Sequence, residues 1–126
     1  MAEPTARTVE RDTVALRVWE WPGHEPPALL LHGIGNYGRY WDAFAAAIGG
    51  RVRLIAPDAR GHGDSGAPER GYESEEFVAD ALAILGALGV ERAAYLDDTG
   101  HMSGVDPLLA LDRAARAGEL AAGDLV

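Results

Sequence analysis

The sequence has no cysteine and no lysine among its 126 residues. The absence of cysteine excludes disulfide bonds, thiolate metal ligands and a cysteine nucleophile. All 11 basic residues are arginines; they face 20 acidic residues and give a formal net charge of −9. Nucleic acids and anionic membranes attract proteins through dense positive charge, so neither is an expected partner.

Long apolar runs are also missing. No segment approaches the roughly 20 apolar residues that a membrane span requires. The polar first twelve residues do not resemble a signal peptide, so a cytoplasmic protein is expected. A hydrophobic content of 48% with 25% charged residues is typical of a globular chain, and the length suits one compact domain.

The order of apolar segments predicts alternating strands and helices. The expected strands are Thr5–Val9, Thr13–Trp19, Ala28–Leu31, Val52–Ala56 and Ala93–Leu96, the first two forming a hairpin. The expected helices are Tyr40–Ile48, ended by glycines, Ser74–Leu88, capped by Ser74, and a third from Asp106 to Gly118. This order predicts an α/β fold with a doubly wound, mostly parallel sheet behind the hairpin and helices on both faces.

Two glycine-rich turns follow predicted strands. The first, His32-Gly33-Ile34-Gly35, could direct backbone N–H groups at a developing oxyanion, or could be an ordinary strand-to-helix loop. The second runs from Pro57 to Gly66. There we expect Asp58 and Arg60 to pair and His62 to order the loop rather than to act in catalysis.

The two turns, with Trp41 between them, together resemble the N-terminal part of the α/β-hydrolase superfamily. The likeness covers roughly residues 5–96 and is greatest to its epoxide hydrolase, haloperoxidase and esterase-like branch. The resemblance implies that Gly33 and Ile34 form the oxyanion turn, with the Ile34 N–H as one donor. It also implies a nucleophile elbow after the strand Ala93–Leu96.

The chain departs from that pattern where the elbow is expected. When the family pattern is continued without a gap past the strand Ala93–Leu96, Thr99 falls at the nucleophile position and His101 where a glycine belongs. Ser103 is then displaced from the centre of a turn. These three are the candidate catalytic residues. Only 22 residues follow Gly104, and none of them is a histidine. We therefore expect a sheet truncated before its later strands, and impaired catalysis.

Residues 97–126 have a different likeness, to the C-terminal region of type III β-ketoacyl-acyl-carrier-protein synthases. It rests on Gly100-His101-Met102, on the run Asp106–Asp112 and on Gly118–Val126. In that family an asparagine before the helix joins the active site; here His101 takes its place, and the family's cysteine is absent. We therefore expect a hydrolase part, residues 1–96, fused to a ketosynthase-like part, residues 97–126.

Three functional hypotheses remain open. The leading one is hydrolysis of an ester-type or related bond in a small-molecule substrate. The others are a fragment of a ketosynthase-like acyltransferase and a non-catalytic module whose exposed sheet edge makes a homo- or hetero-oligomer. Asp97, Asp98, His101 and Asp106 could also form an oxygen-rich metal site. The alternative is that Asp106 caps a helix and that the other residues belong to a solvated acidic loop. We favour the alternative and expect no metal or cofactor.

Overall fold

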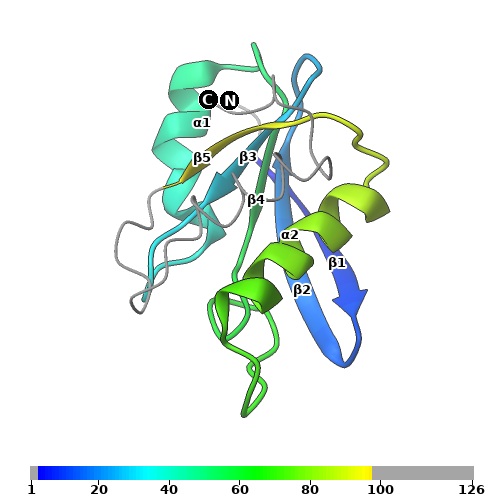
Figure 1. The fold of residues 1–126 in the computed structure, drawn as a ribbon. Coiled ribbons are helices and arrows are strands. Elements are labelled where there is room, and N and C mark those ends of the chain that lie inside the picture. Colours follow the sequence, from blue (N-terminus) through cyan, green and yellow to red (C-terminus); the bar gives the residue numbers. More distant parts are fainter. Residues whose placement is uncertain (1–2, 98–126) are drawn as a thin grey trace.

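The computed structural model describes residues 3–97. After the N-terminal hairpin, its strands and helices alternate as the sequence predicts (Figure 1). The elements are β1 (Thr5–Arg11), β2 (Val14–Trp21), β3 (Ala28–Leu31), a 3-10 helix η1 (Gly38–Trp41), α1 (Asp42–Ile48), β4 (Leu54–Pro57), α2 (Ser74–Ala87) and β5 (Ala94–Asp97). The helix expected from Asp106 to Gly118 lies outside the described residues.

The five strands form one sheet in the order β1-β2-β4-β3-β5. The inner strand β3 is parallel to both β4 and β5. The hairpin joins through antiparallel pairs of β1 with β2 and of β2 with β4. A two-residue connection closes the hairpin, with Asp12 in the left-handed region at φ 55°. The fold is thus α/β, with a parallel part extended by the predicted N-terminal hairpin.

Helices α1 and α2 lie on opposite faces of the sheet (Figure 1). The alternation of side chains along the strands creates a core on each face. On one face, α2 contributes Ala81, Ile84 and Leu85, which pack against the inward side chains of β1 and β2. On the other face, Trp41 and Ala45 pack against Leu54 and neighbouring residues of the sheet. The predicted three-layer arrangement is therefore present in the described part of the chain.

The segment predicted as one helix from Tyr40 to Ile48 is in fact two. A tight 3-10 turn from Gly38 to Trp41 precedes α1. The turn is fixed because the Gly38 N–H donates to the Asp58 carboxylate at 2.6 Å and the Tyr40 N–H donates to the carbonyl of Tyr37. Gly49 ends α1 at φ 61°, as expected for a glycine cap.

The start of α2 differs from the predicted cap. Ser74 is the first helical residue rather than the residue before it, and its hydroxyl bonds the carboxylate of Glu75. Glu73 occupies the cap position without a side-chain hydrogen bond. The acidic first turn, Glu75 and Glu76, still lies where the helix dipole favours negative charge. Within residues 3–97, no helix has the length and apolar character needed to cross a membrane.

Candidate active site

The carboxyl ends of two neighbouring parallel strands define the candidate site. In the β3–β5 register, Leu31 lies opposite Asp97, the last residue of each strand. The turn that begins at His32 and the carboxyl end of β5 therefore lie at the same edge of the sheet. In parallel sheets this edge is where ligands bind, because the loops from successive strands meet there.

His32 fixes the turn after β3 and is almost fully buried. The Ala59 N–H donates to its Nε2 at 2.9 Å, and its Nδ1 lies 2.8 Å from the carbonyl oxygen of Gly33. A backbone N–H can only donate, so Nε2 is an acceptor and the ring proton lies on Nδ1, which donates to Gly33. His32 thus joins the loops after β3 and β4 through both ring nitrogens.

The predicted oxyanion turn has the tight shape that its glycines suggest. Gly35 has φ +80°, and the Asn36 N–H donates to the carbonyl of Gly33 at 3.1 Å. Ile34 is 55% exposed, so this turn lies at the protein surface. The role of the Ile34 N–H as an oxyanion donor stays a prediction.

Asp58, the first residue after β4, anchors the loop that follows this strand. Its carboxylate accepts hydrogen bonds from the Gly38 N–H at 2.6 Å, the Trp19 indole N–H at 3.2 Å and the Asp64 N–H at 2.9 Å. Asp58 is buried, and the three donors come from η1, β2 and its own loop. This carboxylate therefore holds three segments together at the candidate site.

The predicted pairing of Asp58 with Arg60 is wrong. The guanidinium of Arg60 instead binds Asp80 of α2, from Nε to Oδ2 at 2.7 Å and from Nη2 to Oδ1 at 2.8 Å. This hydrogen bond raises the pKa of Arg60 above its ordinary value. The carboxylate of Asp58 is already occupied by N–H donors, so the arginine pairs with the buried carboxylate of the helix.

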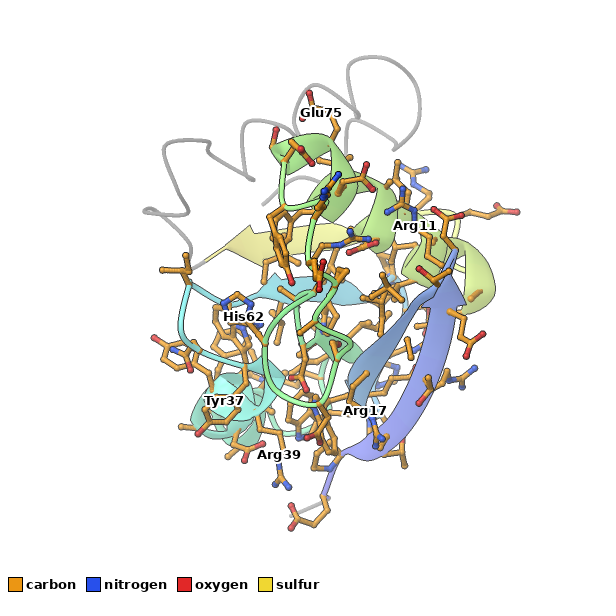
Figure 2. The ribbon with its side chains drawn as sticks, turned by 90° about the horizontal axis from the view of Figure 1, so that it is seen from below. Arg11, Arg17, Tyr37, Arg39, His62 and Glu75 are labelled. Atoms are coloured by element: carbon orange, nitrogen blue, oxygen red, sulfur yellow. The ribbon has the colours of Figure 1, made fainter. Side chains whose placement is uncertain are left out.

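The carboxylate of Asp80 also binds Arg11 at the end of β1, at 2.9 Å from Nη1 to Oδ1. Figure 2 shows Arg11 beside α2, and its other terminal nitrogen lies 2.9 Å from Glu76. The hydrogen bond to Asp80 is the main cause of the raised pKa of Arg11. The hairpin, the loop after β4 and α2 therefore share one ionic cluster.

The ring of His62 lies next to the turn after β3. Its Nδ1 is 3.0 Å from the carbonyl oxygen of Arg60, and its ring centre is 5.1 Å from that of His32 at an interplanar angle of 57°. Its backbone N–H donates to Ala59, and its carbonyl accepts from Ser65. These bonds are those of a residue that orders its loop, and they place a half-buried imidazole at the candidate site (Figure 2).

The three candidate catalytic residues, Thr99, His101 and Ser103, lie outside the described residues. The same holds for Asp98 and Asp106 of the weighed metal site, and for the ketosynthase-like segment. Asp97 is the last residue of β5. In the range 3–97, no group of three or more histidine, cysteine, aspartate or glutamate side chains is arranged to hold a metal ion.

Asp80 is the important residue that the sequence reasoning missed. It lies within the apolar stripe of α2, next to Ala81 and one turn before Ile84. A charged residue is rarely buried unless it is paired, so its position in that stripe was an available signal for a buried arginine partner. The role of Trp19 as a donor to Asp58 had no comparable signal in the sequence.

Comparison with known proteins gives a consistent result. A family described as the alpha/beta hydrolase fold matches residues 26–96. Epoxide hydrolase A of Mycobacterium tuberculosis is 35% identical over an alignment that covers 95% of this chain and 39% of the relative. A non-heme chloroperoxidase of Burkholderia pyrrocinia is 35% identical over 75% of this chain and 34% of the relative. The chain thus spans between a third and two fifths of the length of these relatives.

Solved structures share the same arrangement. An alpha/beta hydrolase from Novosphingobium aromaticivorans superimposes with a TM-score of 0.77 at 27% identity, covering 97% of this chain and 43% of that structure. An epoxide hydrolase mutant from Vigna radiata superimposes with a TM-score of 0.71 at 33% identity, covering 79% of this chain and 32% of that structure. Sequence and structure comparisons therefore agree on the fold.

Proposed function

Because this chain belongs to the α/β-hydrolase fold family, we propose that the carboxyl edge of β3 and β5 is a hydrolase site for ester-type or related bonds in a small-molecule substrate. The single observation that carries the proposal is the pairing of Leu31 with Asp97. It brings the start of the glycine turn after β3 beside the carboxyl end of β5. Similarity to proteins named epoxide hydrolase and chloroperoxidase supports the same class of site.

The turn supplies the electrostatic part of the reaction. Attack on an ester carbonyl places negative charge on its oxygen, and a fixed backbone N–H stabilises that charge without reorganising. We assign this role to the N–H of Ile34, in the turn that His32 holds rigidly through Gly33. Loss of one such donor lowers the rate by about 10² to 10³ in hydrolases.

The nucleophile is the impaired part of the proposed site. The sequence after Leu96 is Asp97-Asp98-Thr99-Gly100-His101, which has no serine at the centre of a Gly-x-Ser-x-Gly turn. A hydroxyl side chain needs sharp presentation and a neighbouring base to be an effective nucleophile. We therefore propose slow hydrolysis, with the hydroxyl groups of Thr99 and Ser103 as the candidate nucleophiles.

The test is steady-state hydrolysis of p-nitrophenyl acetate and of styrene oxide by the full chain. We expect slow, saturable ester hydrolysis that falls to background in Ile34→Pro, which lacks the N–H, and persists in Ile34→Ala, which keeps it. Circular dichroism checks that both variants are folded. Thr99→Ala and Ser103→Ala then identify the hydroxyl group involved.

A matched control distinguishes hydrolysis at the proposed site from the direct reaction of an exposed histidine with an activated ester. His24 is exposed and lies in the loop before β3, at the opposite end of that strand from the site. His24→Asn is expected to leave the rate unchanged. Equal rates in the wild type and in Ile34→Pro would contradict the hydrolase assignment, whereas fast turnover with stoichiometric inhibition would contradict the proposed impairment.

A further inference from the structure

We propose that a cavity at the C-terminal end of α1 binds a small, neutral, apolar molecule about the size of one substituted benzene ring. The cavity has a volume of about 200 Å³, and all of its lining residues lie between positions 21 and 54. The inference is carried by the size of the cavity, by the chemistry of its lining and by the rigidity of its walls. It is independent of the proposed hydrolase function.

The position of the cavity separates it from the candidate active site. Trp21, the last residue of β2, is paired with Leu54, the first residue of β4, and both line the cavity. Because β4 is parallel to β3, the start of β4 lies at the amino edge of these strands. The candidate active site lies at their carboxyl edge, so the two sites can be tested separately.

The lining of the cavity is apolar. Trp21, Ala45 and Leu54 belong to the core on the α1 face and are 7%, 7% and 2% exposed. Val52 packs against the same core, and the other lining residues are a proline and two glycines, so no lining side chain carries a charge. Apolar cavities of about 150 Å³ stay dry and bind benzene. The larger volume here fits a ring that carries one small substituent.

Two consecutive glycines leave the cavity open to solvent. Gly49 ends α1 at φ 61°, Gly50 follows at φ 83°, and both are exposed. A Cβ at Gly50 would have the Pro22 carbonyl oxygen, 3.9 Å away, as its nearest neighbour. No side chain therefore closes the cavity at these two positions, and a small molecule can enter there.

The walls of the cavity are fixed by the backbone. The loop between β2 and β3 is held against the segment before β4, because the Arg53 N–H donates to the carbonyl of His24 at 3.0 Å. Gly23 lies so close to this segment that a Cβ would collide with the backbone of Val52. A cavity whose walls are already ordered loses little conformational freedom on binding, which favours affinity for a small ligand.

The charged side chains that adjoin the lining residues in sequence have partners of their own. The guanidinium of Arg51 donates to the carbonyls of Ile48 at 2.9 Å and Ala47 at 3.1 Å, at the end of α1. Glu20 pairs with Arg53 at 2.8 Å. None of these charged side chains lines the cavity. The site therefore suits a neutral ligand rather than an ion.

The experiment titrates the full chain with toluene and follows amide and indole N–H signals by NMR. We expect saturable shifts at Gly49, Gly50 and Val52 and at the indole N–H of Trp21, with a Kd of about 1 mM. Sodium benzoate has the same ring with a carboxylate in place of the methyl group. At equal concentrations it should leave these signals unchanged, because burying an unpaired charge in an apolar cavity is costly.

A matched pair of variants on α1 locates the binding. Ala45→Leu fills the cavity and should raise the Kd for toluene about tenfold or more. Ala47→Leu makes the same change at an exposed position of the same helix and should keep the wild-type Kd. If urea titration shows that Ala45→Leu is unfolded, Val52→Phe is measured in its place. Absence of saturable shifts, equal Kd values in the filled and control variants, or benzoate binding as tight as that of toluene would overturn the proposal.

Discussion

The guanidinium of Arg60 and the carboxylate of Asp80 meet in a two-point contact, at 2.7 and 2.8 Å, between the loop after β4 and helix α2. Both side chains are almost fully buried, with 5% and 8% of their surfaces exposed. A buried charge without its partner is strongly destabilising, so this pair determines how the candidate site is held on the helix.

Replacing Asp80 with asparagine should lower the free energy of unfolding by about 3–5 kcal/mol. Arg60 would remain charged and buried, and its remaining acidic neighbour would be Glu76, 3.9 Å away and more exposed. Urea unfolding followed by tryptophan fluorescence measures this change. The control is Glu69→Gln, at an exposed loop position, for which a change below about 0.5 kcal/mol is expected. A small effect of Asp80→Asn would mean that the pair adds little to stability.

The contribution of the Arg60–Asp80 pair to the free energy of unfolding should not depend on pH over the accessible alkaline range. The hydrogen bond to Asp80 raises the pKa of Arg60 in the folded state. A raised pKa of a basic group gives stability that is present below the unfolded pKa and lost as the pH rises through the folded pKa, which here lies far above neutrality. The stability difference between wild type and Asp80→Asn should therefore stay constant from about pH 7 to 10 in urea titrations.

Gly38→Ala should destabilise the fold by about 2 kcal/mol or more. An added Cβ would lie 2.6 Å from the Ala56 carbonyl oxygen and 2.7 Å from the Trp19 ring. The matched variant is Gly86→Ala, where nothing lies within 4 Å and the residue is helical. It should stabilise α2 by about 0.5–1 kcal/mol, so thermal melting should shift in opposite directions for the two variants.

Asp58→Asn should cost about 2 kcal/mol, since an amide keeps one acceptor oxygen and turns an NH₂ group toward N–H donors. Asp64→Asn, in the same loop, changes an exposed side chain whose backbone N–H still reaches Asp58. Its midpoint in urea should match that of the wild type. Equal losses in the two variants would contradict the central role of Asp58.

Self-association is expected through an edge of the sheet. β1 and β5 are the outer strands among residues 3–97, and β5 pairs on one side with β3. Unpaired backbone groups on an outer strand favour pairing with another chain. Sedimentation velocity over a dilution series in the micromolar range should show dimers or larger species. A monodisperse monomer with a cooperative melt would count against this expectation.

Sequence patterns predicted the local structure well because local structure follows from local spacing. The apolar run Ala28–Leu31 is a strand, as expected, with its two central residues buried. The helix predicted from Ser74 is present and packs on a core, and Gly49 ends α1 as expected. The pattern could not show that β2 pairs with β4 in the antiparallel direction, since strand order is set by contacts distant in sequence. The 3-10 turn at Gly38 was missed for the same reason, because a carboxylate twenty residues later fixes it.

The site was only partly predictable. The two glycine turns and the half-buried His62 were identified from spacing, and the structure brings His62 against His32. The choice of partner for Arg60 was not predictable from the loop alone. It depends on which carboxylate the packed helix presents, and sequence proximity favoured Asp58 over the more distant Asp80.

The ionic cluster at Asp80 has a consequence for how this molecule fluctuates. One carboxylate receives arginines from the end of the first hairpin strand and from the loop that carries His62. Neither segment can separate from the helix without leaving a desolvated charge behind. Amide protons of the hairpin, of that loop and of α2 should therefore exchange with solvent through a common opening event, at similar rates.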